Sequence, residues 1–212
     1  TIIEDRSLCI RDIAPQDDMI LIEGRTNEET SSGIILPKGE KTECWYGKVL
    51  ACGPGKENPV TGDRYPIPFK KGDWLLVMGY TGADIEVGGK KYKIIREAGV
   101  WAKLKVSERE GRLEILEVEP YRGKALCKMR DLDVTRSGLL HLPTNPQVKY
   151  TTARVVRVGP GLRNLKTGVI EEMGVKPGDE VLVERYGGAD VLECREKYRI
   201  LEWMEVYAIV EE

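Results

Sequence analysis

The stretch Trp45-Tyr46-Gly47-Lys48-Val49-Leu50-Ala51-Cys52 runs directly into Gly53-Pro54-Gly55. Its aromatic and aliphatic residues favour a β-strand, and the Gly-Pro-Gly triplet ends that strand because both residue types favour turns. The triplet recurs as Gly159-Pro160-Gly161, 106 positions later, where it follows a second apolar run, Ala153–Val158. Two strands with the same ending predict two copies of one β-rich unit.

Other motifs keep the same offset, which extends the repeat over most of the chain. Lys70-Lys71-Gly72-Asp73 corresponds to Lys176-Pro177-Gly178-Asp179, and Tyr80–Asp84 corresponds to Tyr186–Asp190. Upstream, Pro15 and Pro120 are 105 apart, so the second copy holds one extra residue before Pro143. A repeat of this length is a domain rather than a solenoid unit. We therefore predict two domains, residues 1–107 and 108–212.

Each copy is predicted to be all-β, because short apolar runs alternate with turns and helical periodicity is absent. The predicted strands of the first copy are Leu8–Ile13, Met19–Glu23, Trp45–Cys52, Trp74–Met78 and Val100–Val106, with a hairpin in Lys56–Phe69 that turns at Thr61-Gly62. Those of the second copy are Leu113–Val118, Lys124–Met129, Ala153–Val158, Glu180–Glu184 and Glu205–Val210.

Composition argues against several classes of function. The net charge is −2 in 212 residues, so no basic excess predicts nucleic-acid binding. The apolar runs are too short to span a membrane. Five cysteines, an odd number without a CxxC pair, favour a reducing compartment. His141 is the only histidine, so zinc sites and Ser–His–Asp catalysis lack their usual residues.

A second feature is an aliphatic run between very polar flanks. Ile34-Ile35-Leu36 lies between Gly33 and Pro37, and both neighbouring segments are rich in charged residues. A buried core strand is one interpretation of this run. The other is a hydrophobic segment on a solvated loop, held out for a partner to bury. The same design recurs at Ser137–Pro143.

The order of these motifs resembles the chaperonin 10 family of co-chaperonins: GIIL-P, GxVLAxGPG, a polar excursion, KxGD, an apolar strand and YxG, found twice. Two copies in one chain look like the double-domain co-chaperonins of plastids, the chaperonin 20 type. The resemblance implies two tandem GroES-like Greek-key β-barrels that assemble side by side into a ring. It also implies that the ring caps a group I chaperonin 60 in its ATP cycle, with the nucleotide on the partner and no cofactor here.

In that family a mobile loop presents an aliphatic tripeptide to the chaperonin. The resemblance assigns this role to Gly33, Ile34, Ile35 and Leu36 in the first copy, and to Leu139, Leu140 and Leu142 in the second. The second loop departs from the pattern, because four residues rather than three separate Gly138 from Pro143. Either its leucines still form the contact, or this copy binds more weakly.

Two other classes of function stay open beside the co-chaperonin. An oxidoreductase fragment shares this topology, but it would need a GxGxxG nucleotide-binding half and zinc ligands, which are missing. A GroES-fold interaction module without folding activity is the stronger alternative. The expected compartment is the cytoplasm, with plastid stroma as the alternative. Because the family's rings hold an odd number of domains, two-domain chains require an unused domain or a single-domain co-chaperonin partner.

Overall fold

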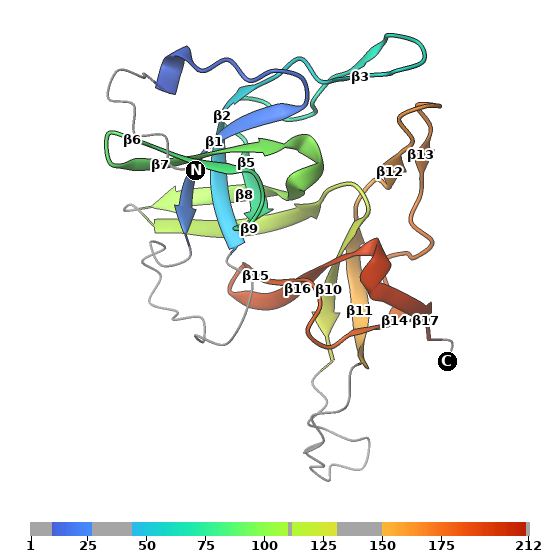
Figure 1. Ribbon diagram of the computed structural model, residues 1–212. Coiled ribbons are helices and arrows are strands. Elements are labelled where there is room, and N and C mark those ends of the chain that lie inside the picture. The colour runs from blue at the N-terminus through green and yellow to red at the C-terminus, as the bar shows by residue number, and fades with distance from the viewer. Residues whose placement is uncertain (1–9, 27–43, 110–111, 131–149, 211–212) are drawn as a thin grey trace. The chain divides into compact units, whose positions relative to one another are not determined.

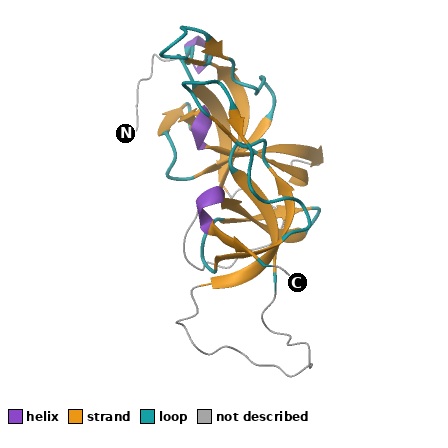
Figure 2. Cartoon of the chain, turned by 90° about the vertical axis from the view of Figure 1, so that its right-hand side faces the viewer, coloured by secondary structure: helices purple, strands orange, loops and turns teal. Residues whose placement is uncertain are grey.

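The computed structural model describes residues 10–26, 44–109, 112–130 and 150–210. Strands dominate these residues, and the helical elements among them are three short 3-10 turns (Figure 2). The prediction of an all-β chain is thus confirmed. The chain forms two compact units, one of Thr1–Val118 with Arg163–Val169 and the other of Glu119–Leu162 with Ile170–Glu212. The boundary at residue 107 concerns the sequence repeat and stays a prediction.

The first unit contains a seven-stranded sheet in the order β6-β7-β1-β2-β5-β8-β9 (Figure 1). Its strands are β1 (Met19–Thr26), β2 (Cys44–Cys52), β5 (Trp74–Met78), β6 (Ala83–Val87), β7 (Lys90–Arg96), β8 (Val100–Arg109) and β9 (Arg112–Pro120). A separate hairpin pairs β3 (Lys56–Glu57) with β4 (Arg64–Tyr65), and the 3-10 turns are η1 (Ile10–Asp12) and η2 (Glu97–Gly99). The predicted hairpin is confirmed, with Gly62 in the left-handed region at φ 77°.

The second unit repeats this topology in a six-stranded sheet of order β15-β16-β10-β11-β14-β17. Its strands are β10 (Lys124–Met129), β11 (Tyr150–Val158), β14 (Glu180–Glu184), β15 (Ala189–Glu193), β16 (Glu196–Glu202) and β17 (Val206–Ile209), beside the hairpin β12 (Leu162–Arg163) and β13 (Ile170–Glu171) and the turn η3 (Trp203–Glu205). The order matches the first sheet without β9. The duplication is therefore confirmed in three dimensions.

Both sheets have the predicted Greek-key order, in which β1 lies between β7 and β2, and β10 lies between β16 and β11. Within the described residues, hydrogen bonding does not join the two end strands of either sheet, so neither sheet is a closed barrel. The central strand β1 is buried on both faces, as its unbroken apolar run predicts, with Ile20, Leu21 and Ile22 at most 1% exposed.

Two glycines let large side chains lie flat against the first sheet. A Cβ atom on Gly24 would lie 1.9 Å from the ring of Trp45, and one on Gly47 would lie 2.5 Å from Cδ1 of Ile22. Neither distance is possible between carbon atoms, so any other residue would displace these core side chains. Glycine is required here by close packing, not by backbone conformation.

One predicted strand is wrong. In the segment Leu8–Ile13 the described residues form η1 and no strand, and Ile10 and Ile13 pack against the buried side chains of Leu21, Ile85 and Tyr92. The equivalent segment of the second copy does form a strand, β9, which lies beside β8 in the first sheet. The two segments differ in whether a neighbouring strand is available, because an isolated strand has no partner for its backbone groups.

The two copies make the same hairpin turn with different residues. Gly88 and Gly89 connect β6 to β7 with φ of 60° and 73°. Cys194 and Arg195 connect β15 to β16 with φ of 49° and 68°. Two successive positive φ angles define a turn that favours Asn-Gly or Gly-Gly, because side chains clash with the backbone in this region.

We therefore expect the double substitution Cys194→Asn and Arg195→Gly to stabilise the second unit by about 1 kcal/mol. Urea unfolding should show a higher midpoint with an unchanged slope. The matched control is Gly88→Cys with Gly89→Arg, which should lower the midpoint. If both double variants shift stability in the same direction, the strain of the turn is not the cause.

Candidate functional site

The aliphatic residues predicted to bind the chaperonin lie between paired strands in both units. Gly33, Ile34, Ile35 and Leu36 fall between β1 and β2, and Leu139, Leu140 and Leu142 fall between β10 and β11. All seven residues are outside the described part of the chain, so their role stays a prediction. The structure describes the strand ends that carry these segments.

The ends of the first segment are held side by side. β1 and β2 pair in antiparallel fashion up to Thr26, which lies opposite Trp45, so the chain leaves and re-enters the sheet at one point. On the return side Cys44, Trp45 and Tyr46 are buried. Burial raises the pKa of the Tyr46 hydroxyl, with a smaller contribution from Cys44, so this side chain stays neutral at physiological pH.

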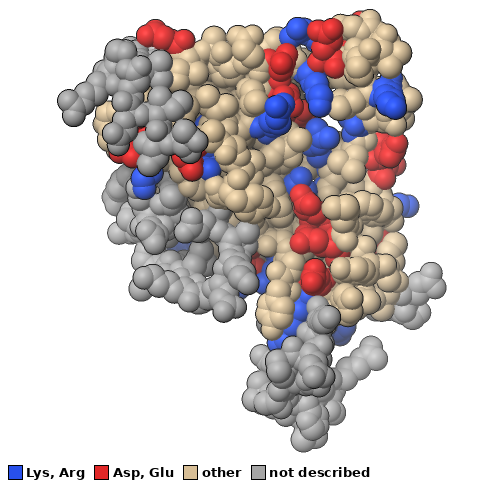
Figure 3. All heavy atoms as spheres, in the orientation of Figure 1, with Lys and Arg blue, Asp and Glu red and all other residues tan. Residues whose placement is uncertain are grey.

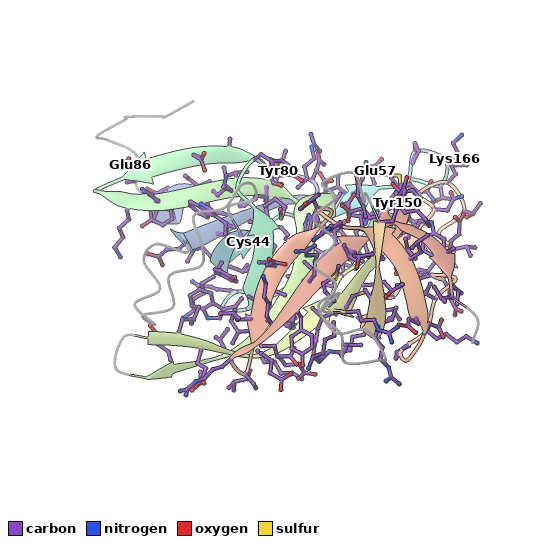
Figure 4. All side chains as sticks on the ribbon, turned by 90° about the horizontal axis from the view of Figure 1, so that it is seen from below. Cys44, Glu57, Tyr80, Glu86, Tyr150 and Lys166 are labelled. Atoms are coloured by element: carbon purple, nitrogen blue, oxygen red, sulfur yellow. The ribbon has the colours of Figure 1, made fainter. Side chains whose placement is uncertain are left out.

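The second segment is likewise flanked by two paired strand ends. β10 and β11 pair up to Met129, which lies opposite Ala153, and the amide of Arg130 donates to the carbonyl of Thr152 over 3.1 Å. β11 begins at Tyr150 (Figure 4), the counterpart of Cys44 at the start of β2. The ring of Tyr150 makes an edge contact with that of Tyr207 at a centroid distance of 5.1 Å. Each copy therefore carries its aliphatic segment at the same end of the same strand pair.

The strand registers also place the extra residue of the second copy. A register shift interrupts β1 at Leu21/Ile22 and β10 at Leu126/Cys127, which are 105 positions apart. Past the loop, the KxGD turns that follow β2 and β11 are 106 positions apart and make identical hydrogen bonds: the amide of Val49 donates to Asp73, and that of Val155 to Asp179. The insertion therefore lies between β10 and β11, in the segment that carries Leu139, Leu140 and Leu142.

Sequence reasoning missed a buried lysine, Lys93, beside the first residues of β2. Lys93 of β7 is 1% exposed, and its Nζ lies 2.8 Å from Asp84, 2.7 Å from the carbonyl oxygen of Gly79 and 5.1 Å from the centre of the Trp45 ring. A lysine so deeply buried is stable because each of these groups compensates for lost water. It ties β7 to β6, to the turn after β5 and to the first residues of β2.

In the second unit an arginine, Arg199, occupies the position of Lys93 and makes equivalent contacts. Arg199 Nε donates to Asp190 over 2.7 Å, and Arg199 Nη1 donates to the carbonyl of Arg185 over 2.6 Å. Partial burial raises the pKa of Asp190, but hydrogen bonds from Arg199 and Lys197 outweigh it and leave the pKa below its usual value. The sequence did contain a signal for this pair, because Asp84 and Asp190 occupy matching positions of the repeat.

The other repeated residues have structural explanations or are exposed. Asp73 accepts a hydrogen bond from the Lys70 amide over 2.9 Å and Asp179 accepts one from the Lys176 amide over 2.8 Å, so both close their own turns. Tyr80 (Figure 4) and Tyr186 are among the most exposed apolar residues described.

What these described residues offer is a scaffold for binding. Acidic and basic side chains are interleaved on the face shown in Figure 3, without a large area of one sign. Among the described residues, no helix is long and apolar enough to cross a membrane, and no cluster of histidine, cysteine, aspartate or glutamate has the size to hold a metal ion. The described residues supply two antiparallel strand pairs, β1 with β2 and β10 with β11, between which the two aliphatic segments fall in the sequence.

Comparison with known proteins gives a family match to both copies. The family model described as "Chaperonin 10 Kd subunit" matches residues 12–104 and 117–210. The 20 kDa chloroplastic chaperonin of Spinacia oleracea is 28% identical over 200 residues, which cover 93% of this chain and 75% of that protein. The protein of the same name from Arabidopsis thaliana is 26% identical over 179 residues, 84% of this chain and 67% of its own length.

Single-domain proteins match one copy at a time. The co-chaperonin GroES of Elusimicrobium minutum is 37% identical over 93 residues, which cover 44% of this chain and 95% of that protein. The co-chaperonin GroES of Caldicellulosiruptor saccharolyticus is 40% identical over 91 residues, 42% of this chain and 94% of its own length. These two matches cover less than half of this chain, whereas the matches to the 20 kDa chaperonins cover most of it.

Proposed function

Because this chain belongs to the chaperonin 10 family, we propose that it is a double-domain co-chaperonin that caps a group I chaperonin 60 and closes its folding chamber. The observation that carries this proposal is the repeated pair of strands that flanks each aliphatic segment. Two sheets whose strand orders match, apart from the additional β9 of the first, carry an aliphatic segment in a polar context between the same two strands of the sequence. The alternative of an interaction module without folding activity is not favoured by relatives that are named co-chaperonins.

The expected contact is weak for one segment and strong for several together. Burying three large aliphatic side chains contributes roughly 5–9 kcal/mol. Ordering each residue of a flexible segment opposes this by about 1–2 kcal/mol. The two terms nearly cancel, so one segment binds poorly, but linked segments gain about 10²–10⁴ in avidity. A cap built in this way binds firmly and is released when the chaperonin changes state.

A binding experiment with a purified chaperonin 60 tests this function. We expect the chain to co-elute with the chaperonin when ATP or ADP is present and to elute separately without nucleotide. The nucleotide is expected on the chaperonin, and we propose neither a cofactor nor a catalytic role for the chain itself. Absence of binding under both conditions would contradict the proposal.

We also propose that the chain assembles into a ring through the open edge of β17. In the first unit the equivalent strand β8 has β9 beside it, with an ion pair of 2.6 Å between Lys105 and Glu117. Within the described residues β17 pairs with β14 on one side and with nothing on the other. The burial differs accordingly: Trp101 and Leu104 of β8 are 6% and 3% exposed, whereas their counterparts Tyr207 and Val210 are 53% and 39% exposed.

The segment that would fill this edge is the counterpart of β9 in another chain. β9 contains Leu113–Val118, and in the matching segment Leu8–Ile13 the described residues 10–13 pair with no other described strand. Pairing of this segment with β17 of a neighbour would satisfy two open backbone edges at once. Repeated head to tail, this contact closes a ring. A single-domain co-chaperonin supplies the same strand, so a mixed ring is compatible with an odd number of domains.

The two relatives that match both copies are named chloroplastic, and they favour the plastid stroma over the cytoplasm. We therefore propose the plastid as the site of action.

A further inference from the structure

The first unit contains two segments of the second copy, and each lies against a particular part of the first copy. One is β9, which pairs with β8. The other is Arg163–Val169, which holds the turn of the β12–β13 hairpin and lies against Tyr65 of the β3–β4 hairpin. In the second unit the described residues place no strand beside the outer edge of β17, and they leave Glu171, the counterpart of Tyr65, exposed.

The contact at Tyr65 joins an aromatic ring to a cation. The guanidinium carbon of Arg163 lies 5.0 Å from the centre of the ring, within the range of a cation–π interaction. A Cβ on Gly168 would lie 2.9 Å from the Tyr65 hydroxyl oxygen, so the turn of the second hairpin touches the ring. Asn58 donates to that hydroxyl over 2.9 Å, and Arg163 donates to the carbonyl of Gly168 over 3.0 Å. Each partner is thus held in position by its own hairpin.

The two hairpins have the same internal structure, so their positions can be compared directly. Asn58 and Asn164 each accept two hydrogen bonds from backbone amides of their own turn. Gly62 and Gly168 follow with φ of 77° and 73°. Their surroundings differ, because a Cβ on Gly62 would meet no described atom within 4 Å, whereas Gly168 lies against Tyr65. The place that corresponds to the Gly168 contact is therefore open on the first hairpin.

Each hairpin has two faces, because residues opposite each other in a ladder point to one side and successive residues point to opposite sides. In the first hairpin Glu57 lies opposite Arg64, so these two share the face that does not carry Tyr65. By the repeat, Arg163 takes the position of Glu57 and Glu171 that of Tyr65, so they too lie on opposite faces. The chain thus presents one hairpin face with Glu57 and Arg64, and another with Glu171.

A neighbouring chain that pairs with β17 would bring these two faces together. Inside the first unit, the strand beside β8 and the turn beside Tyr65 both belong to the second copy. In the proposed ring, the strand beside β17 belongs to the first copy of the next chain. Because the two copies share one topology, the same arrangement at β17 places the hairpin of that copy against Glu171, with its face of Glu57 and Arg64.

The charges on the two faces are complementary. Glu171 provides a carboxylate where the first copy has the ring of Tyr65, and Arg64 provides a guanidinium. Nη2 of Arg64 lies 3.2 Å from Glu57, but Nη1 is 4.0 Å from Asp17, and the side chain is 45% exposed. A guanidinium has five N–H donors, so it can bind a second carboxylate. Glu57 alone would repel Glu171, and Arg64 compensates for both.

We propose that Glu171 of one chain and Arg64 of the next form an ion pair that joins the hairpins of neighbouring chains. This inference rests on the proposed ring of co-chaperonin chains, and the partner is a second copy of this chain. It adds a second contact to the edge of β17. Around the ring, the cation–π contact of Tyr65 and Arg163 within each chain alternates with this ion pair between chains.

Charge reversal on the intact chain tests the pair. Native mass spectrometry and sedimentation at micromolar concentration measure assembly. R64E places like charges at the contact and should weaken assembly by about tenfold or more. R64E/E171R restores opposite charges and should return assembly to within about threefold of the unmodified chain. The matched control R64E/E172R adds the same charge at the next exposed residue, on the other side of the strand, and should not restore assembly.

A further variant, E171Q, removes the carboxylate from an exposed position and should also weaken assembly, whether or not R64E folds. Unchanged assembly of E171Q or of a folded R64E chain overturns the inference, as does equal recovery by R64E/E172R. A single-chain mass for the unmodified protein overturns it as well, since no contact between chains then exists. Nucleotide-dependent binding to chaperonin 60, measured in parallel, tests the proposed function separately.

Discussion

Replacement of Ile34, Ile35 and Leu36 by serine is expected to abolish nucleotide-dependent binding to chaperonin 60. Each lost aliphatic contact removes about 1.5–3 kcal/mol, so three together weaken one segment by far more than a hundredfold. The effect is multiplied in a ring, because every chain loses the same contact. The three residues lie outside β1 and β2, so the sheet should unfold at an unchanged urea concentration. Co-elution with the chaperonin in ATP, at several protein concentrations, measures the loss.

The control for this variant comes from the same segment. Alanine in place of Thr30, Ser31 and Ser32 changes three neighbouring residues without removing any aliphatic side chain, and it should leave capping intact. Capping that survives the serine variant would show that the assignment of this segment is wrong. Capping that fails in both variants would point to the conformation of the segment rather than to its aliphatic side chains.

Serine at Leu139, Leu140 and Leu142 distinguishes the two interpretations of the second segment. The strand registers place one extra residue between β10 and β11, and in the sequence four residues rather than three separate Gly138 from Pro143, so the leucines do not have the spacing of Ile34–Leu36. If that spacing matters, this variant loses less affinity than the first. Equal losses would indicate that the longer segment presents its leucines as well.

The sequence predicted most strands because their apolar residues are buried in the core of their own unit. The strands Trp74–Met78, Lys124–Met129 and Glu180–Glu184 were predicted with the observed bounds, since an apolar run there begins after a turn and ends at another. The repeat contributed as much as local pattern did. An ambiguous stretch in one copy could be interpreted from its clearer counterpart in the other.

What the sequence did not reveal depends on neighbours that are distant along the chain. Leu8–Ile13 has the pattern of a strand, but a strand needs a partner edge, and β8 provides one only to Leu113–Val118. Lys93 is an ordinary lysine until Asp84, Gly79 and Trp45 surround it. Such contacts between distant residues cannot be predicted from the local sequence pattern.

Substitution of Val210 by glutamate is expected to dissociate the proposed ring into single chains. Its counterpart Leu104 is buried beside β9, so a carboxylate at Val210 would be buried without a partner once a neighbour pairs with β17. Such a charge opposes association by several kcal/mol, which is at least a hundredfold in affinity. The single chain should keep its stability, because Val210 is already partly exposed and its backbone amide still donates a hydrogen bond to the carbonyl oxygen of Glu180.

The neighbouring residue provides the control on the same strand. Ile209 corresponds to Lys103, which stays partly exposed beside β9 and forms an ion pair of 2.9 Å with Asp73. The variant Ile209→Lys should therefore assemble normally, because Asp179 occupies the position of Asp73 and can accept the new lysine. Native mass spectrometry and sedimentation at micromolar concentration compare the two variants. A ring that persists with glutamate at position 210 would place the contact between chains elsewhere, whereas loss of the ring in both variants would indicate that β17 tolerates no change.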